Sequence, residues 1–549
     1  MTALRRAGGL VVLLLVSSAA PVAAQQHAHP APVAAIPRDS ARVPIYDNLG
    51  RHHYAVTTSV PLAQRYFDQG LRLTWGFNHA EAIRAFEEGE RLDSTCAMCA
   101  WGTAYALGPN INAGMDSAAG VRARRAVERA KVAARGATPR ERALIEALAA
   151  RYAPVPPADR AALDSAFAAR MAEVASRFAD DAETQVIHAD ALMNLSPWNY
   201  WTADGGARPA TPLILQRLEG VLAANADHPG ACHLFIHAVE AKYPRRALPC
   251  AERLAALMPG AGHVVHMPGH IYVRVGRYAD AIAANLHALH SDGELMEGRG
   301  VARRGTYPNG YHPHNWHFLA FAATMAGNSR TAIDAARKTV ERLDPVVVPW
   351  VEPVLPLVPL TLSTFGRWRE VLAEPLPTNA PASQVALTWY ARGVAHAALG
   401  RTGEAASALR EARRAAARVP AGETAIAARV AVRALEGEIA LRGGDPRSAV
   451  RHFTDAVAVE DSLAYNEPPT WYYPVRQSLG QALLAAGRPA EAERVYREDL
   501  ELFPENGWSL FGLARALDAQ RKEGEASEVR QRFAKAWKGA DVKLTGSRF

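Results

Sequence analysis

Small and large side chains recur at fixed places along pairs of predicted helices. Residues 262–289 predict one helix, a turn at Gly276-Arg277, and a second helix that runs back antiparallel to the first. The packing positions of this pair are filled by Gly269, Tyr272, Ala281 and Ala288. One such pair leaves an apolar face uncovered, and only stacking against neighbouring pairs buries it. The pattern therefore predicts an all-α fold, a continuous array of antiparallel helix pairs.

Other stretches repeat the same spacing. The first unit carries it at Gly70, Leu73, Ala82 and Phe86, and the second opens with Gly102 and Tyr105. Three further units follow near the C-terminal end, beginning at Thr388. Ala and Arg are abundant and runs of Val, Ile and Thr are rare, which favours helices throughout.

Over most of residues 61–537 this pattern resembles the tetratricopeptide repeat (TPR) family. The runs IHAVE, HMPGHIYVRVGRY and HPHNWHFLAFAATMAG resemble, more narrowly, exported bacterial TPR proteins of unsettled function. The resemblance implies a TPR-like α-solenoid, a right-handed superhelix whose concave face is built from the first helix of each unit. It also implies that slots two, five, nine and twelve of that helix line a groove that binds a protein or peptide.

The chain divides at changes in this pattern. The predicted segments are a signal peptide (1–24), a flexible N-terminal segment (25–60), N-terminal TPR-like repeats (61–119), irregular helical repeats (120–230), central His-rich TPR-like repeats (231–346), and C-terminal TPR-like repeats with capping helices (347–549). Residues 291–312 interrupt the central repeats, and we expect them to form either a flap over the groove or a solvated loop.

The first 24 residues have the three parts of an export signal. Arg5 and Arg6 precede an apolar run from Leu10 to Val16, and Val22-Ala23-Ala24 fits a cleavage site. We therefore expect a periplasmic or secreted protein with no stable membrane insertion after cleavage; an uncleaved anchor is the alternative. Cleavage lowers the formal net charge of +7 by two. No dense basic stripe with interleaved aromatics is present, which argues against a nucleic-acid partner.

Histidine gathers in the predicted groove slots of three successive units. Residues 263–317 hold eight of the chain's 19 His. The groove residues predicted in these units are His233, His237, Glu240, His263, His266, His270, His314 and His317. The same slots hold Gln64, Phe67 and Leu71 near the start of the chain.

Two interpretations of these His remain open. In the first, the i, i+4 pairs His233/His237 and His266/His270 each share a transition-metal ion, because that spacing stacks the two rings. A third ligand from a neighbouring helix, His317 or Glu240, would complete the shell, and zinc or copper would suit imidazole. In the second, the His are polar groove residues that hydrogen-bond a bound peptide.

The four Cys form two candidate pairs. Cys96 and Cys99 stand at a helix start, where a disulfide, a thiolate pair or half of a metal site is feasible. Antiparallel packing would bring Cys232 to Cys250, which predicts a second disulfide; free buried thiols are the alternative. Oxidised pairs would fit an exported chain.

The sequence carries no phosphate-binding loop, no GxSxG elbow, no HExxH and no dinucleotide fingerprint. It therefore predicts a binding scaffold that holds a protein or peptide partner in a His-rich groove, with or without a divalent metal. The alternative is a metal-dependent hydrolase in which Glu240 stands beside a metal-bound water. Two loops are further candidates for contact with a ligand, one through Trp198 and the other through Asn110 and Asn112.

Overall fold

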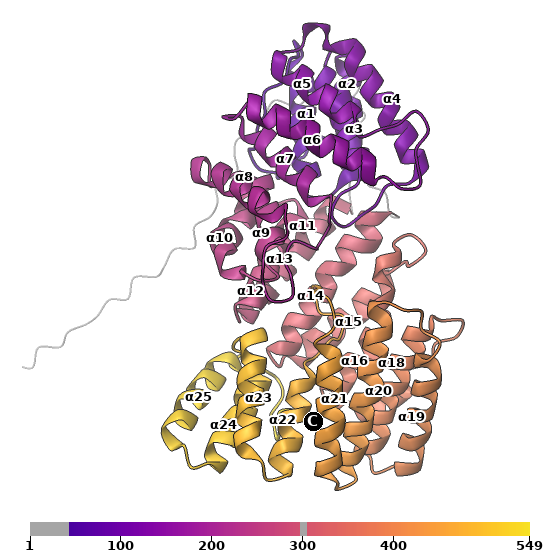
Figure 1. Cartoon of the computed structure of the whole chain (residues 1–549), viewed down its shortest axis with the longest axis vertical. Coiled ribbons are helices and arrows are strands. Elements are labelled where there is room, and N and C mark those ends of the chain that lie inside the picture. The colour runs from indigo at the N-terminus through magenta and orange to yellow at the C-terminus, as the bar shows by residue number, and fades with distance from the viewer. Residues whose placement is uncertain (1–42, 297–304) are drawn as a thin grey trace, which may run out of the picture. The chain divides into compact units, whose positions relative to one another are not determined.

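The computed structural model describes residues 43–296 and 305–549, and this part of the chain is all-α and forms one compact unit. The predicted signal peptide lies outside it. The helices follow one another as antiparallel pairs (Figure 1). Among the described residues, no helix is both long enough and apolar enough to cross a bilayer.

The helices of the N-terminal half are α1 (Pro61–Trp75), α2 (His79–Leu92), α3 (Ala97–Leu107), α4 (Ser117–Ala133), α5 (Pro139–Ala149), α6 (Ala161–Arg177), α7 (Ala182–Met193) and α8 (Thr211–Ala224). The central helices are α9 (Pro229–Val239), α10 (Leu248–Leu257), α11 (Gly262–His266), α12 (Pro268–Arg274), α13 (Tyr278–Met296), α14 (His312–Met325) and α15 (Ser329–Arg342), with a π-helical turn, η3 (Tyr307–Tyr311), before α14.

The helices of the C-terminal half are α16 (Leu357–Thr364), α17 (Trp368–Ala373), α18 (Ala382–Ala398), α19 (Thr402–Ala416), α20 (Glu423–Arg442), α21 (Pro446–Glu460), α22 (Val475–Ala485), α23 (Pro489–Leu502), α24 (Gly507–Ala519) and α25 (Glu523–Ala536). Shorter 3₁₀ turns are η1 (Ala134–Gly136), η2 (Pro244–Ala247) and η4 (Pro349–Val354).

Large rings pack onto small residues, as the repeat pattern predicts. The ring of Phe86 on α2 fills the space that a Cβ would need at Gly70 on α1 and at Gly102 on α3. Tyr496 on α23 does the same at Gly480 and Gly512. In each case, one aromatic ring on the second helix of a unit packs against two first helices. One belongs to the same unit and the other to the next unit. This packing confirms the predicted α-solenoid of TPR type.

The C-terminal helices return to the central ones. The indole N–H of Trp508 on α24 donates to the carbonyl of Thr324 on α14 (2.9 Å). Gly276, in the turn before α13, has a φ of +80° and lies against the backbone of Pro504. These contacts join segments that are about 180 and 230 residues apart in sequence. The C-terminal helices therefore pack against the central helices as well as against their neighbours in the chain.

Two predictions about irregular segments are wrong within the described residues. The segment 25–60 was expected to be flexible, yet Tyr46 and Leu49 are buried and Gly260 donates its N–H to the Asn48 carbonyl (2.7 Å). Extended backbone carries no helical period, so the sequence pattern does not detect it. The predicted insertion at residues 291–312 begins as helix, because α13 continues to Met296; residues 297–304 lie outside the described part.

The structure brings both Cys pairs to disulfide distance. The Cα atoms of Cys232 and Cys250 lie 5.1 Å apart, and those of Cys96 and Cys99 lie 5.3 Å apart. The first pair links α9 to α10 and the second lies at the start of α3. Oxidised pairs at these positions are compatible with an extracytoplasmic protein.

We expect a Cys232→Ala/Cys250→Ala variant to lose about 3 kcal/mol of unfolding free energy, because the bridge closes a loop across 18 positions in the unfolded chain. The Cys96–Cys99 bridge spans only three positions, so a Cys96→Ala/Cys99→Ala variant should lose less unfolding free energy. Denaturant unfolding with and without reductant measures both. Four alkylated thiols in the native protein, found by mass spectrometry, would contradict the two bridges.

Candidate functional site

Six of the predicted His converge on one place in the central repeats. Helix α9 carries His233 and His237, and α14 carries His314. The other three lie on α11 and α12, which Pro268 separates because proline lacks the N–H that would continue the helix. Met267 between them keeps helical angles, so His263, His266 and His270 share one face.

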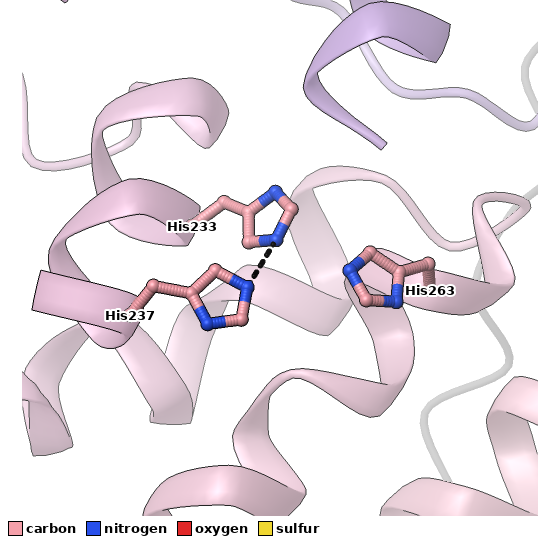
Figure 2. Close-up of side chains that lie close together, drawn as sticks. All are labelled: His233, His237 and His263. Carbon is pink, nitrogen blue, oxygen red and sulfur yellow. Dashed lines mark hydrogen bonds between the residues drawn. The ribbon is translucent and has the colours of Figure 1, made fainter. Parts of the chain in front are cut away.

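The first cluster, triad A, consists of His233, His237 and His263. One ring nitrogen from each lies within 4.8 Å of the others. Figure 2 shows the rings of His233 and His237 side by side on one helix, with His263 facing them from another. The Nε2 atoms of His233 and His237 are 3.1 Å apart. Two helices thus supply three nitrogens to one small volume.

The second cluster, triad B, repeats this arrangement with His266, His270 and His314, whose ligand atoms also lie within 4.8 Å of one another. The Nε2 atoms of His266 and His270 are 2.8 Å apart. The two i, i+4 pairs were predicted to share an ion with His317 or Glu240. The structure brings His263 to the first pair and His314 to the second, and it places Glu240 within 4.8 Å of ligand atoms of His237 and His270, whereas His317 joins none of these groups.

The Nδ1 atoms of the four paired rings are each tied to an acceptor. His233 Nδ1 lies 2.5 Å from the Trp75 carbonyl, and His266 Nδ1 lies 2.8 Å from the Asn285 amide oxygen. His237 Nδ1 and His270 Nδ1 lie 2.8 and 2.5 Å from the two oxygens of Glu240. Because the carbonyl, amide and carboxylate oxygens accept, the Nδ1 atoms of neutral rings carry the protons.

These tautomers leave lone pairs on all four Nε2 atoms. Burial lowers the pKa of His233 and His266 well below the usual value, and neighbouring His lower both further, so these rings are neutral at neutral pH. A proton on one Nε2 of a pair makes an N–H···N hydrogen bond of this length, and an ion that both nitrogens bind takes the place of that proton. Nitrogens bound to one ion at about 2.1 Å would be this far apart at an angle of about 85–95°, so the geometry suits a shared cation.

His263 reinforces this conclusion. It is 1% exposed, and neither ring nitrogen has a hydrogen-bond partner among the described residues. Burying a polar ring without a partner costs about 1–3 kcal/mol. A ligand bound at triad A would satisfy the nitrogen that this ring contributes to the cluster.

Glu240 links the two triads. It is fully buried at the end of α9, and its two oxygens accept from one ring of each triad. Burial alone would raise the pKa of this carboxyl, but the His270 and His237 rings lower it to about 2. Each oxygen accepts from one ring, so Glu240 orients a ring of each triad.

Aromatic side chains from distant segments enclose the triads. Phe77, in the turn after α1, stacks on His263 with ring centroids 5.4 Å apart and also contacts His233 at 4.5 Å. Trp198 lies edge-on to His237 (5.1 Å), and its indole N–H donates to Asn112 (3.0 Å). Phe318 covers His270 at 4.4 Å. Both loops that the sequence suggested, those of Asn112 and Trp198, therefore reach the site.

A second hydrogen-bond set fixes the start of α11. Tyr307 in the π-helical turn accepts from the His263 N–H (3.0 Å) and donates to Asp292 (2.8 Å), which also accepts from Asn315 (2.9 Å). Burial raises the pKa of Asp292 to about 7. Tyr307 belongs to the segment that the sequence suggested as a flap. Phe77, Asn285 and Asp292 were not assigned to the site from the sequence, and Phe77 and Asn285 carry no motif that indicates such a role.

The prediction of an open His-lined groove is wrong at these positions. The six residues His233, His237, Glu240, His263, His266 and His270 are at most 2% exposed. His314 and His317 are partly exposed at the edge of the site, and His317 joins neither triad. Two of the enclosing residues, Phe77 and Trp198, come from outside the three units in which the groove was predicted, and repeat spacing alone does not reveal such distant covers.

A third cluster, made of His52, His228 and Glu183, differs from the triads because a carboxylate stands at its centre. His52 and His228 approach one oxygen of Glu183 at 2.8 and 3.3 Å, and Trp75 donates its indole N–H to the other (2.7 Å). His228 Nδ1 accepts the N–H of Ala231 at the start of α9, so its proton sits on Nε2, which faces the carboxylate. In that tautomer His228 directs a proton, and no lone pair, at the carboxylate, so a metal at this cluster would have to displace that proton.

The chain has similar solved structures but matches no family model. No protein-family model and no curated protein matches the chain. Similar solved structures include the human IFIT1 dimer with PPP-AAAA (12% identity, 87% of this chain and 91% of that chain, TM-score 0.33) and with m7Gppp-AAAA (10%, 87% and 91%, 0.31), and the APC/C hetero-tetramer Cut9-Hcn1 (13%, 87% and 94%, 0.27). The fold assignment rests on the helix pairs and their packing.

We expect Glu240→Gln to destabilise the protein by about 2–4 kcal/mol, because an amide NH₂ would face one of the two Nδ1–H groups in a buried site. Glu294→Gln is the matched control: Glu294 also pairs with a His, His290 (3.3 Å), but both side chains are more than half exposed. It should change stability by less than about 0.5 kcal/mol. Equal unfolding midpoints for the two variants would contradict this role of Glu240.

Proposed function

We propose that this TPR-type α-solenoid is a metal-binding protein that holds two transition-metal ions in its interior, one at triad A and one at triad B. The observation that carries the proposal is the placement of four buried rings, each with Nδ1 at hydrogen-bond distance from an oxygen and Nε2 directed at the Nε2 of its neighbour. Neutral imidazole with this orientation is the usual protein ligand for zinc and copper.

Three His ligands to one ion resemble catalytic rather than structural zinc sites, because one coordination position stays open. The fixed Glu240 does not support the hydrolase alternative in the form that uses this residue as a base. Together with the predicted export signal, the two Cys pairs support a periplasmic or secreted location, where metal binding would compete with few cytosolic thiols.

Binding of a protein or peptide is a second candidate function, at a different place. Residues 547–549 lie among the C-terminal repeats: Ser547 donates to the Gln477 carbonyl (2.8 Å), Arg548 stacks over Tyr473 (3.7 Å) and Phe549 contacts Trp508. A segment of the chain itself thus occupies the kind of surface on which TPR-like repeats would hold an extended peptide. We propose no nucleic-acid partner.

We expect the purified protein, refolded with zinc or copper and dialysed, to retain about two ions per chain by elemental analysis. His237→Ala should remove the ion of triad A and leave about one. His290→Ala, on an exposed side chain outside both triads, should retain two. Retention of fewer than one ion per chain by the wild-type protein, with the fold intact by circular dichroism, would rule the proposal out.

We expect a chain lacking residues 546–549 to bind a synthetic peptide of residues 541–549 with a Kd of about 1–100 μM by calorimetry. The full chain should bind it far more weakly, since its own segment competes. A peptide with Arg548→Ala is the control and should lose most of the affinity, because the cation–π contact is removed. Equal binding to the two chains would count against the second candidate.

A further inference from the structure

We infer that the two ions form one coupled copper pair and that this pair binds dioxygen. The inference rests on the proposed function and goes further by naming the metal, the ligand and the chemical step.

The two triads are in contact with each other. Ring centroids within the triads are 4.7–6.4 Å apart. Between the triads, His263 lies 5.6 Å from His266 and His237 lies 5.4 Å from His270. Because the distances between triads are no longer than those within them, the ions would be neighbours in one centre and could share a small bridging ligand.

The charge of the site favours ions of low charge. The six imidazoles are neutral ligands, and the linking carboxylate, Glu240, contributes a single negative charge from outside both triads. Two divalent ions would leave a net charge of about +3 in a buried place, and two monovalent ions about +1. Burying uncompensated charge is costly, so the monovalent state is favoured. Copper is the biological metal that takes a stable monovalent state with imidazole.

The walls of the site suit a small apolar ligand. Phe77, Trp198 and Phe318 pack directly on the rings. Access is more open at His314, the one partly exposed member of the six.

The step balances with the two ions alone. Each Cu(I) gives up one electron, and dioxygen takes up both to become a peroxide dianion that bridges the two Cu(II) ions. The O–O bond order falls from two to one, two Cu–O interactions form, and no proton is gained or lost. Return of the two electrons releases dioxygen.

The test uses the full chain loaded anaerobically with Cu(I), then exposed to dioxygen. We expect uptake of about one dioxygen per two copper ions, a new near-ultraviolet charge-transfer band, and little electron paramagnetic resonance signal, because the two Cu(II) spins are coupled. His263→Gln should disrupt triad A, abolish the band and leave the signal of an isolated Cu(II). His290→Ala should behave as the wild type.

Each other outcome is decisive. Bound copper that shows the full signal of two isolated Cu(II) ions, or that takes up no dioxygen, overturns this inference while leaving a two-metal protein. Retention of zinc in preference to copper at equal supply also overturns the inference of a copper pair and leaves a two-metal protein. A chain that binds no metal at all removes both this inference and the proposed function. A variant that fails to fold is recognised by circular dichroism, and His314→Gln, on the partly exposed ring, then replaces His263→Gln with the same expectation for triad B.

Discussion

The carboxylate of Glu240 joins two neighbouring units of the array. One oxygen holds His237 on its own helix, α9, and the other holds His270 on α12. A fully buried carboxylate is stable only when its charge is compensated and its oxygens are hydrogen-bonded. The positions of α9 and α12, and with them the directions of two imidazoles, therefore depend on each other. Loss of this link would leave a charge or two polar rings without partners inside the protein.

The rest of the architecture holds that link in place. Pairing of small and large residues sets the distance between successive helices, as with Phe86 against Gly70 and Gly102. The Cys232–Cys250 pair ties α9 to α10, and Tyr307 with Asp292 fixes the beginning of α11. The last two contacts act on helices that carry His of the triads. The result is a rigid arrangement of ligands on helices, which a metal centre needs more than a surface loop could supply.

Repeat proteins commonly use an exposed concave face for binding, and this chain departs from that use in its centre. Phe77 and Trp198, from segments before the His-rich units, cover the face that the repeats alone would leave open. Both residues have positive φ, 53° and 63°, which is uncommon for aromatic residues. At Phe77 the backbone bonds that end α1 hold this conformation, since Asn78 donates its N–H to the Leu73 carbonyl (3.0 Å). The cover turns a groove into an interior, and this burial lowers the pKa of His233, His263 and His266.

The sequence by itself determined the helix pairs, their order and the gathering of His on three consecutive units, because these depend on local periodicity and on slots that repeat. It also indicated the i, i+4 pairs His233/His237 and His266/His270, since helical geometry alone brings them together. Only the tertiary structure decided that His263 and His314, and not His317, complete the triads, that Glu240 lies between them, and that the site is buried. Those relations join residues tens to hundreds of positions apart, and their geometry depends on how helices pack, which periodicity does not encode.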